Sequence, residues 1–128
     1  MTHKENKPLL HVVGTLPRSL YSQLPDTLSN YTIYQSNGLM KHIEKRHPDC
    51  ISYLNNISDI IKNPDYIGVS PNETVPSFEL VKKLNNNILV GIKLDKKDNY
   101  FYVATLHTIT TAKLNRRIAN GRLKAVDK

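Results

Sequence analysis

The fold of this chain is decided by residues 78–109, which read FELVKKLNNNILVGIKLDKKDNYFYVATLHTI. Three runs within it, at 78–84, 88–94 and 100–109, are rich in β-branched and aromatic residues, which favour strands. The segments that join them, 85–87 and 95–99, have the length and composition of hairpin turns. We therefore expect three consecutive antiparallel strands.

Alternation along these strands predicts which side chains share a face of the sheet. In the central strand Ile88, Val90 and Ile92 fall on one side. We call the opposite side of the sheet the second side. Strict alternation in the last strand places Phe101 and Val103 on it. If helices cover the first side, the second side forms a polar surface that includes Glu79, Lys83, Lys93, Thr105 and His107. Such a surface suits a phosphodiester, although each residue is also consistent with an exposed strand position that has no role.

Helical spacing is found in the part of the chain before these strands. A first helix is expected to begin with Ser36 as its N-cap. Its positions with three-to-four spacing are Leu39, Met40, Ile43 and His47. A second segment repeats this spacing at 51, 54, 57, 60 and 61. Pro48 should separate the two, because proline disfavours the α conformation in the residue before it, and Asn63-Pro64-Asp65 should end the second helix.

Shorter elements are expected toward both ends of the chain. Residues 10–16 and 31–34 favour strands, and Pro17 is placed to open a short helix that runs to Leu24. The basic segment 114–124 predicts one more helix or a hairpin partner.

Length and composition predict a single domain over residues 1–128. The chain is 39% hydrophobic and 23% charged, which is enough for one core. We expect a frayed terminus over 1–8, a helical part over 36–62 and a sheet part over 66–124. The net charge of +7 and the pI of about 9.5 favour a nucleic-acid partner, although solubility alone also accounts for them.

The single cysteine and the short apolar runs indicate the cellular compartment in which the protein is expected. Cys50 has no second cysteine with which to form an internal disulfide. The apolar run from Leu9 to Gly14 is interrupted by His11 and is too short for a signal or membrane segment. We expect a reduced bacterial cytoplasm and no membrane partner.

The block Lys45-Arg46-His47-Pro48-Asp49 carries the clearest chemical signal, together with His42, which stands five positions before His47. His47 is the first candidate for general acid/base. A helix C-terminus favours the imidazolium and two adjacent cations oppose it, so a pKa near seven is expected. Arg46 suits a bidentate phosphate contact, Lys45 a point-charge contact, and His42 the orientation of substrate. The alternative is an ordinary basic helix end in which His47 caps a carbonyl.

Other chemistries fit these residues poorly. His42 and His47 stand at i and i+5, positions that a helix does not bring together, so we expect no metal site. Cys50 is separated from His47 by a proline break, which gives no geometry for a thiol nucleophile. The five glycines are scattered singly, so a glycine-rich phosphate loop is excluded, and we expect no cofactor.

Several of these motifs together resemble the phage barnase/EndoU/colicin/RelE-like nuclease domains found in prophages. The resemblance spans about residues 36–124 and rests on Lys45-Arg46-His47-Pro48, Asn63-Pro64-Asp65-Tyr66 and Ala104-Thr105-Leu106-His107-Thr108-Ile109. It implies an α+β ribonuclease with helices packed on one face of a roughly four-stranded antiparallel sheet and RNA on the other. It also implies metal-independent cleavage, in which the ribose 2′-hydroxyl attacks the adjacent phosphate and leaves a 2′,3′-cyclic end.

The resemblance and the strand pattern supply further site candidates. Thr105 matches a position at which the family tends to carry a hydroxyl. His107 is the second imidazole on the same strand face, although an aromatic is commoner there in the family. The remaining candidates for phosphate or RNA binding are Lys83, Lys93, Arg116 and Arg117. Tyr66 is expected to pack under the sheet.

Two classes of function follow from these observations. The first is a phage- or prophage-encoded endoribonuclease that cleaves tRNA or a phage or host transcript. The second is a non-catalytic module that binds nucleic acid, or a phage or host protein such as an inhibitor, with the same basic surface. They differ in whether a second proton-transfer group, from His42, Glu79 or His107, lies near His47.

Overall fold

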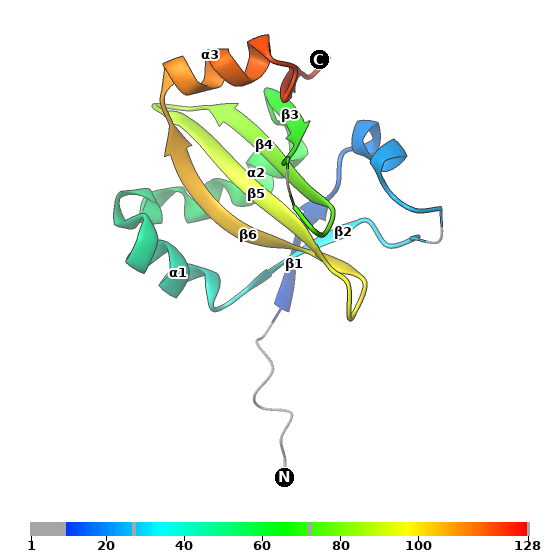
Figure 1. Cartoon of the computed structure of the whole chain (residues 1–128). Helices are drawn as coiled ribbons and strands as arrows, with labels where there is room; N and C mark the ends of the chain where they lie inside the picture. Colours follow the sequence, from blue (N-terminus) through cyan, green and yellow to red (C-terminus); the bar gives the residue numbers. More distant parts are fainter. Residues whose placement is uncertain (1–9, 27, 72, 128) are drawn as a thin grey trace.

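A seven-stranded sheet forms the centre of the computed structural model, which describes residues 10–26, 28–71 and 73–127 (Figure 1). The expected frayed terminus over 1–8 lies outside the described residues. The strand order is β1-β2-β6-β5-β4-β3-β7, and among these described strands only the β2–β6 pair is parallel. The strands are β1 (Leu10–Thr15), β2 (Thr32–Ser36), β3 (Tyr66–Val69), β4 (Ser77–Lys83), β5 (Asn87–Asp95), β6 (Tyr100–Ile109) and β7 (Leu123–Ala125).

The α+β class and the expected β4-β5-β6 meander are confirmed, but a four-stranded sheet is wrong. Short segments extend the meander on both sides. On one side β2 joins β6, with Ile33 paired to Phe101, and β1 joins β2. On the other side β3 pairs with both β4 and β7. These pairings join segments distant in the chain, which local sequence patterns do not specify.

The helices are η2 (Arg18–Gln23), α1 (Leu39–Arg46), η3 (Pro48–Asn56), α2 (Ile57–Lys62) and α3 (Thr111–Ala119), of which η2 and η3 are 3₁₀-helices. The break at Pro48 is confirmed. Ser36 is not an N-cap, because it ends β2 paired with Leu10, and Gly38 takes the cap position. The spacing of three in Ile51, Leu54 and Ile57 fits the three residues per turn of a 3₁₀-helix.

The main core lies between the sheet and the α1-η3-α2 layer. Ile43, Ile60, Ile88, Val90 and Ile92 are fully buried in it. We call this side of the sheet the core face. The expectation that helices cover the Ile88, Val90 and Ile92 side is therefore confirmed.

A β-bulge at Ala104 changes the expected alternation in β6. Gly91 pairs with Thr105 and Ile92 with Val103, so Ala104 is the extra residue. Phe101 and Val103 consequently lie on the core face and are buried, contrary to strict alternation. Thr105 stays on the opposite face, in register with Gly91.

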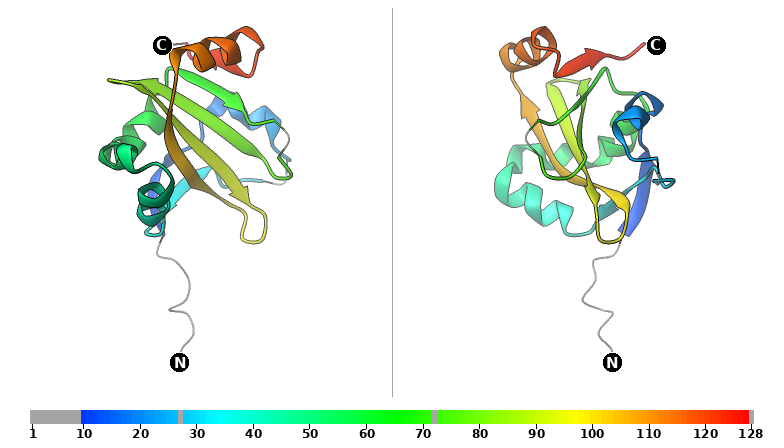
Figure 2. Two further views of the ribbon diagram at one scale, coloured as in Figure 1. Left: turned by 60° about the vertical axis from the view of Figure 1, so that its left-hand side comes forward. Right: turned by 45° about the vertical axis from the view of Figure 1, so that its right-hand side comes forward.

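The second face of the sheet carries α3, so the expectation of helices on one face only is corrected. Leu114 of α3 packs with Val81, Leu89 and Ile109 in a second, smaller cluster. We call this side the α3 face. Figure 2 shows α3 and β7 together at one end of the sheet and the β5–β6 hairpin at the other end. The α3 face is therefore covered by a helix at only one of its ends.

Candidate active site

Three histidines from two distant segments meet beside β6. The ring centroids of His47 and His107 are 5.1 Å apart, and those of His42 and His47 are 6.4 Å apart. His42 Nε2 lies 3.4 Å from Thr105 Oγ1. We call His42, His47, Thr105 and His107 the histidine cluster. The structure thus brings together the four residues that the sequence suggested for catalysis.

Local structure explains why the histidines of α1 reach β6. His47 ends α1, and its backbone N–H donates to the Ile43 carbonyl at 2.7 Å. The described pairing of β2 with β6 covers only Phe101 and Tyr102. Beyond Tyr102, α1 and η3 lie against β6 in place of a strand. The histidines therefore approach the outer edge of β6, where Thr105 and His107 are half-buried.

His47 has a depressed pKa, which differs from the value near seven expected from the sequence. Partial burial lowers its pKa below the ordinary 6.5, and the nearby His107 and Arg46 lower it further. Asp49 acts in the opposite direction. The imidazole of His47 is therefore mainly neutral at pH 7, the form that accepts a proton.

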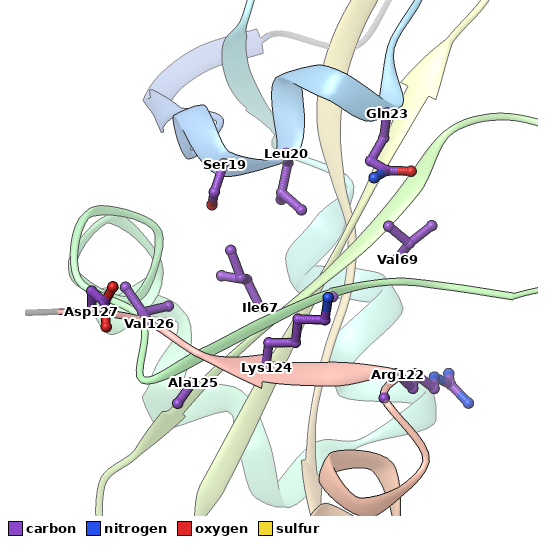
Figure 3. A pocket seen from close by; sticks show the side chains of 12 residues that line it. Ser19, Leu20, Gln23, Ile67, Val69, Arg122, Lys124, Ala125, Val126 and Asp127 are labelled. Carbon is purple, nitrogen blue, oxygen red and sulfur yellow. The ribbon is translucent and has the colours of Figure 1, made fainter.

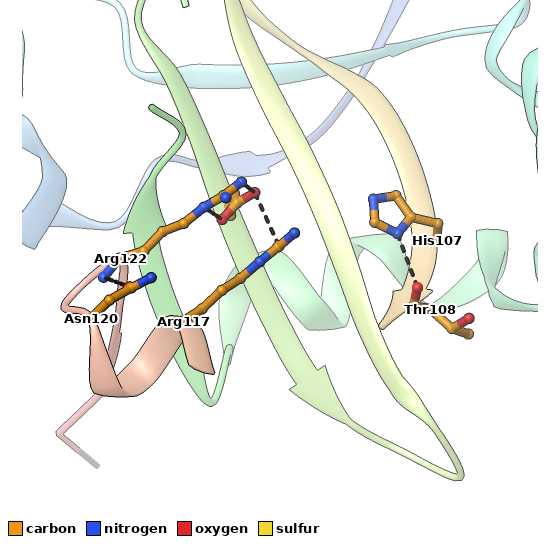
Figure 4. Close-up of polar contacts among 6 residues, drawn as sticks. His107, Thr108, Arg117, Asn120 and Arg122 are labelled. Atoms are coloured by element: carbon orange, nitrogen blue, oxygen red, sulfur yellow. Dashed lines mark hydrogen bonds and ion pairs between the residues drawn. The ribbon is translucent and has the colours of Figure 1, made fainter. Parts of the chain in front are cut away.

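A hydrogen bond to the backbone holds the His107 ring and determines which of its two ring nitrogens stays free. Its Nδ1 lies 3.0 Å from the Thr108 carbonyl oxygen (Figure 4). A carbonyl only accepts, so Nδ1 carries the proton and donates. Nε2 is then the nitrogen available for proton transfer, while the bond restrains the ring.

Of the cations expected at the site, Lys45 and Arg46 lie next to the histidine cluster and are exposed. The others differ in position. Lys93 forms an exposed ion pair with Glu73 at 3.1 Å, and the Lys83 ammonium lies 5.6 Å from the Tyr66 ring centroid, two strands away from β6. Arg116 is exposed on α3.

The strand pattern suggested that Glu79 belongs to an open polar surface, and this expectation is wrong. It is buried in β4, and Arg122 binds both of its carboxylate oxygens, through Nε at 2.9 Å and Nη2 at 2.6 Å. Arg117 adds a longer contact of 3.3 Å (Figure 4). Glu79 is therefore occupied by two guanidinium groups, which leaves His42 and His107 as the proton-transfer partners near His47.

Arg122 is a partner that sequence reasoning missed. It follows Gly121, whose φ of +84° is a left-handed conformation that favours glycine, directly after α3. This turn directs the chain from α3 into β7, which pairs with β3, and the Arg122 side chain reaches Glu79 on β4, the strand beyond β3. The Asn120-Gly121 pair after a helical segment was a signal for the turn, but nothing local indicated Glu79 as the target.

A well-formed cavity lies elsewhere. It measures about 660 Å³ and opens between η2, β3 and β7 (Figure 3). Its lining includes Leu20, Ile67, Val69 and Lys124, and none of the histidine cluster. The candidate site is therefore distinct from this cavity.

Neither a metal cluster nor a membrane-spanning helix is found among the described residues. Over 10–26, 28–71 and 73–127, no three His, Cys, Asp or Glu side chains are grouped so that they could hold a metal ion. Within the same ranges no helix has both the length and the apolar character needed to cross a membrane.

Comparison with known proteins gives a match to one protein family. Residues 11–116 of the 128 match the family described as phage-Barnase-EndoU-ColicinE5/D-RelE like nuclease3. Searches of curated proteins and of solved structures give no significant match. The matched region contains α1, the strands β2 to β6, β1 apart from its first residue, and all four residues of the histidine cluster. The chain therefore belongs to this family of barnase/EndoU/colicin-type nucleases, whose substrates are nucleic acids.

Proposed function

We propose that the chain is an endoribonuclease that cleaves RNA without a metal ion, by attack of the ribose 2′-hydroxyl on the adjacent phosphorus. The observation that carries the proposal is the pair of imidazoles, His47 and His107, at 5.1 Å between centroids on a partly exposed surface. Transesterification of RNA needs one group that accepts a proton and one that donates it. Two histidines of different environment supply both.

His47 takes the role of general base. Its lowered pKa keeps the ring neutral near pH 7, so it accepts the proton of the 2′-hydroxyl as the 2′-oxygen bonds to phosphorus. The bond from phosphorus to the 5′-oxygen breaks in the same reaction. His107, in its protonated form, donates the Nε2 proton to that leaving oxygen. The products are a 2′,3′-cyclic phosphate and a 5′-hydroxyl end.

The other members of the site bind and orient the phosphate. Arg46 and Lys45 are exposed beside His47 and supply positive charge for the phosphate oxygens. When His42 Nε2–H donates to Thr105 Oγ1, the Thr105 hydroxyl hydrogen is free for a phosphate oxygen. Arg117 is assigned as a further phosphate ligand, because it makes the longer of the two arginine contacts with Glu79, and Glu79 lies in register with Gly91 and Thr105.

The proposal is tested by incubating purified protein with total RNA in excess EDTA, followed by analysis of the product ends. We expect cyclic-phosphate ends from the wild type, and their loss in His47→Ala and in His107→Ala. His11→Ala serves as the matched control, because His11 is an exposed histidine on β1, outside the histidine cluster. If the wild type retains RNA in a salt-sensitive manner but cleaves none, the proposal fails and the chain is a nucleic-acid-binding module.

A further inference from the structure

Three tyrosines form a contiguous aromatic cluster on β2 and β6. The Tyr34 and Tyr100 rings meet edge to face, with centroids 5.7 Å apart, and the Tyr100 and Tyr102 centroids are 6.2 Å apart. All three side chains are half-buried, so each keeps part of its surface open to solvent. We call Tyr34, Tyr100 and Tyr102 the tyrosine cluster.

The tyrosine cluster shares the α3 face with Thr105 and His107. Tyr102 pairs with Lys93 of β5, just as Thr105 pairs with Gly91, and residues 91 and 93 of β5 point to the same side. Tyr34 pairs with Tyr102 and therefore lies on this side too. The β-bulge at Ala104 makes this possible, because without it Tyr102 and Thr105 would point to opposite faces.

No helix covers this end of the α3 face in the described part of the chain. The apolar contacts of α3 are with Val81, Leu89 and Ile109, at the far ends of their strands. Figure 1 shows the β5–β6 hairpin, beside which Tyr100 lies, at the opposite end of the sheet from α3. The tyrosine cluster thus lies on the face that also carries Thr105 and His107, at the end that α3 leaves uncovered.

The neighbouring charge suits a polyanion. Lys93 lies in register with Tyr102, and its ion pair with Glu73 involves side chains that are 40% and 36% exposed. Such an exposed pair contributes little stability and exchanges readily for another anion. A cation is therefore available next to the aromatic rings, on a chain of net charge +7.

We propose that the tyrosine cluster binds unpaired nucleobases of single-stranded RNA by stacking, beside the phosphate that contacts the histidine cluster. The RNA substrate rests on the proposed function. Stacking requires bases that are free of a duplex, and it tolerates every base because each has a π-face. The enzyme therefore acts on single-stranded segments with weak base preference, and Tyr102, three residues from Thr105, holds a base that flanks the scissile phosphate.

The test measures binding with an oligonucleotide that cannot be cleaved. A labelled, 2′-O-methylated single strand is titrated with wild type, Tyr102→Leu and Tyr102→Phe, and the anisotropy is recorded. We expect binding that is weaker by about tenfold or more in Tyr102→Leu and little changed in Tyr102→Phe, which keeps the ring. A strand with abasic sites should bind the wild type about as weakly, which repeats the test without a mutation.

The outcomes separate this inference from the proposed function. Equal affinity of Tyr102→Leu and wild type, or equal affinity of the wild type for the intact strand, the abasic strand and a duplex, would overturn the stacking site. If RNA is nevertheless cleaved, the ribonuclease proposal stands alone. Binding that depends on the Tyr102 ring, without any cleavage, would support the stacking site and remove the catalytic proposal.

Discussion

Gly91 lies directly opposite Thr105, and a Cβ placed on Gly91 would come within 3.0 Å of Thr105 Cγ2. This distance is tighter than ordinary van der Waals contact, so a side chain at position 91 would push the Thr105 side chain away by a few tenths of an ångström. Because Gly91 has no side chain, the Thr105 side chain has the space in which its hydroxyl contacts His42.

Gly91→Ala should lower RNA cleavage by about tenfold, because a displaced Thr105 loses one hydrogen-bonding contact, worth about 1 kcal/mol or more. The double variant Gly91→Ala/Thr105→Ser should recover most of the activity, since serine keeps the hydroxyl and lacks the methyl group that clashes. The measurement compares the steady-state cleavage rates of the two variants with those of Thr105→Ser and the wild type. Equal loss in the single and the double variant would contradict the steric explanation.

Removal of either imidazole should reduce cleavage more strongly. General acid/base groups contribute about 10² to 10⁴ in rate, so we expect losses of that size in kcat for His47→Ala and for His107→Ala. The double variant should lose much less than the product of the two, because the residues act as one unit. Single-turnover rates measure these losses, with His11→Ala as the unaffected control. Near-wild-type kcat in either single variant would exclude that histidine from proton transfer.

The pH dependence of cleavage should reflect the depressed pKa of His47. A general base works in its neutral form, so kcat/KM should rise with pH and its acidic limb should lie below pH 6.5, the ordinary histidine value. Asp49 raises the pKa of His47, so Asp49→Asn should move the limb to lower pH. Arg46→Gln should move it to higher pH, because Arg46 lowers that pKa. NMR titration of the His47 ring gives the same shifts without activity, and shifts in the reverse directions would disprove the assignment.

The Glu79 carboxylate should matter for stability. Glu79→Gln removes the charge that two arginines neutralise in a site where only 7% of the Glu79 side chain is exposed. We expect a loss of about 1–3 kcal/mol in the free energy of unfolding, at the low end of values for buried pairs because the arginines are partly exposed. Glu73→Gln breaks an exposed ion pair and should cost at most about 1 kcal/mol. Urea unfolding compares them, and a larger loss in Glu73→Gln would refute the ranking.

Cys50 should be chemically inert in the folded protein. It is 1% exposed, and burial raises the pKa of its thiol, so little reactive thiolate forms at pH 7. A thiol reagent such as iodoacetamide should modify it only on unfolding, as mass spectrometry would show. Cys50→Ala should still cleave RNA. Rapid labelling of the native protein, together with loss of activity, would bring back the thiol nucleophile that the sequence argued against.

Several features of the fold follow from short stretches of sequence. The asparagine run at 85–87 and the charged turn at 95–99 determine the β4-β5-β6 meander, because hairpins form between neighbouring segments. Pro48 ends α1 through the conformation of the residue before it, which is a local steric effect. The same block presents His47, Arg46 and Lys45, so these members of the site could be named from sequence alone.

Other features depend on contacts between distant segments. The bulge at Ala104 places Tyr102 and Thr105 on one face, and it follows from how β6 pairs with β5. The sequence of β6 alone does not predict it. Arg122 reaches Glu79 across 43 positions of the chain, and α3 packs on Val81 and Leu89 of separate strands. Local propensity acts over a few residues. The approach of His47 to His107, the lowered pKa of His47 and the meeting of the three tyrosines arise only when the sheet and the α1 layer close around one core, because burial and distance are properties of the folded chain.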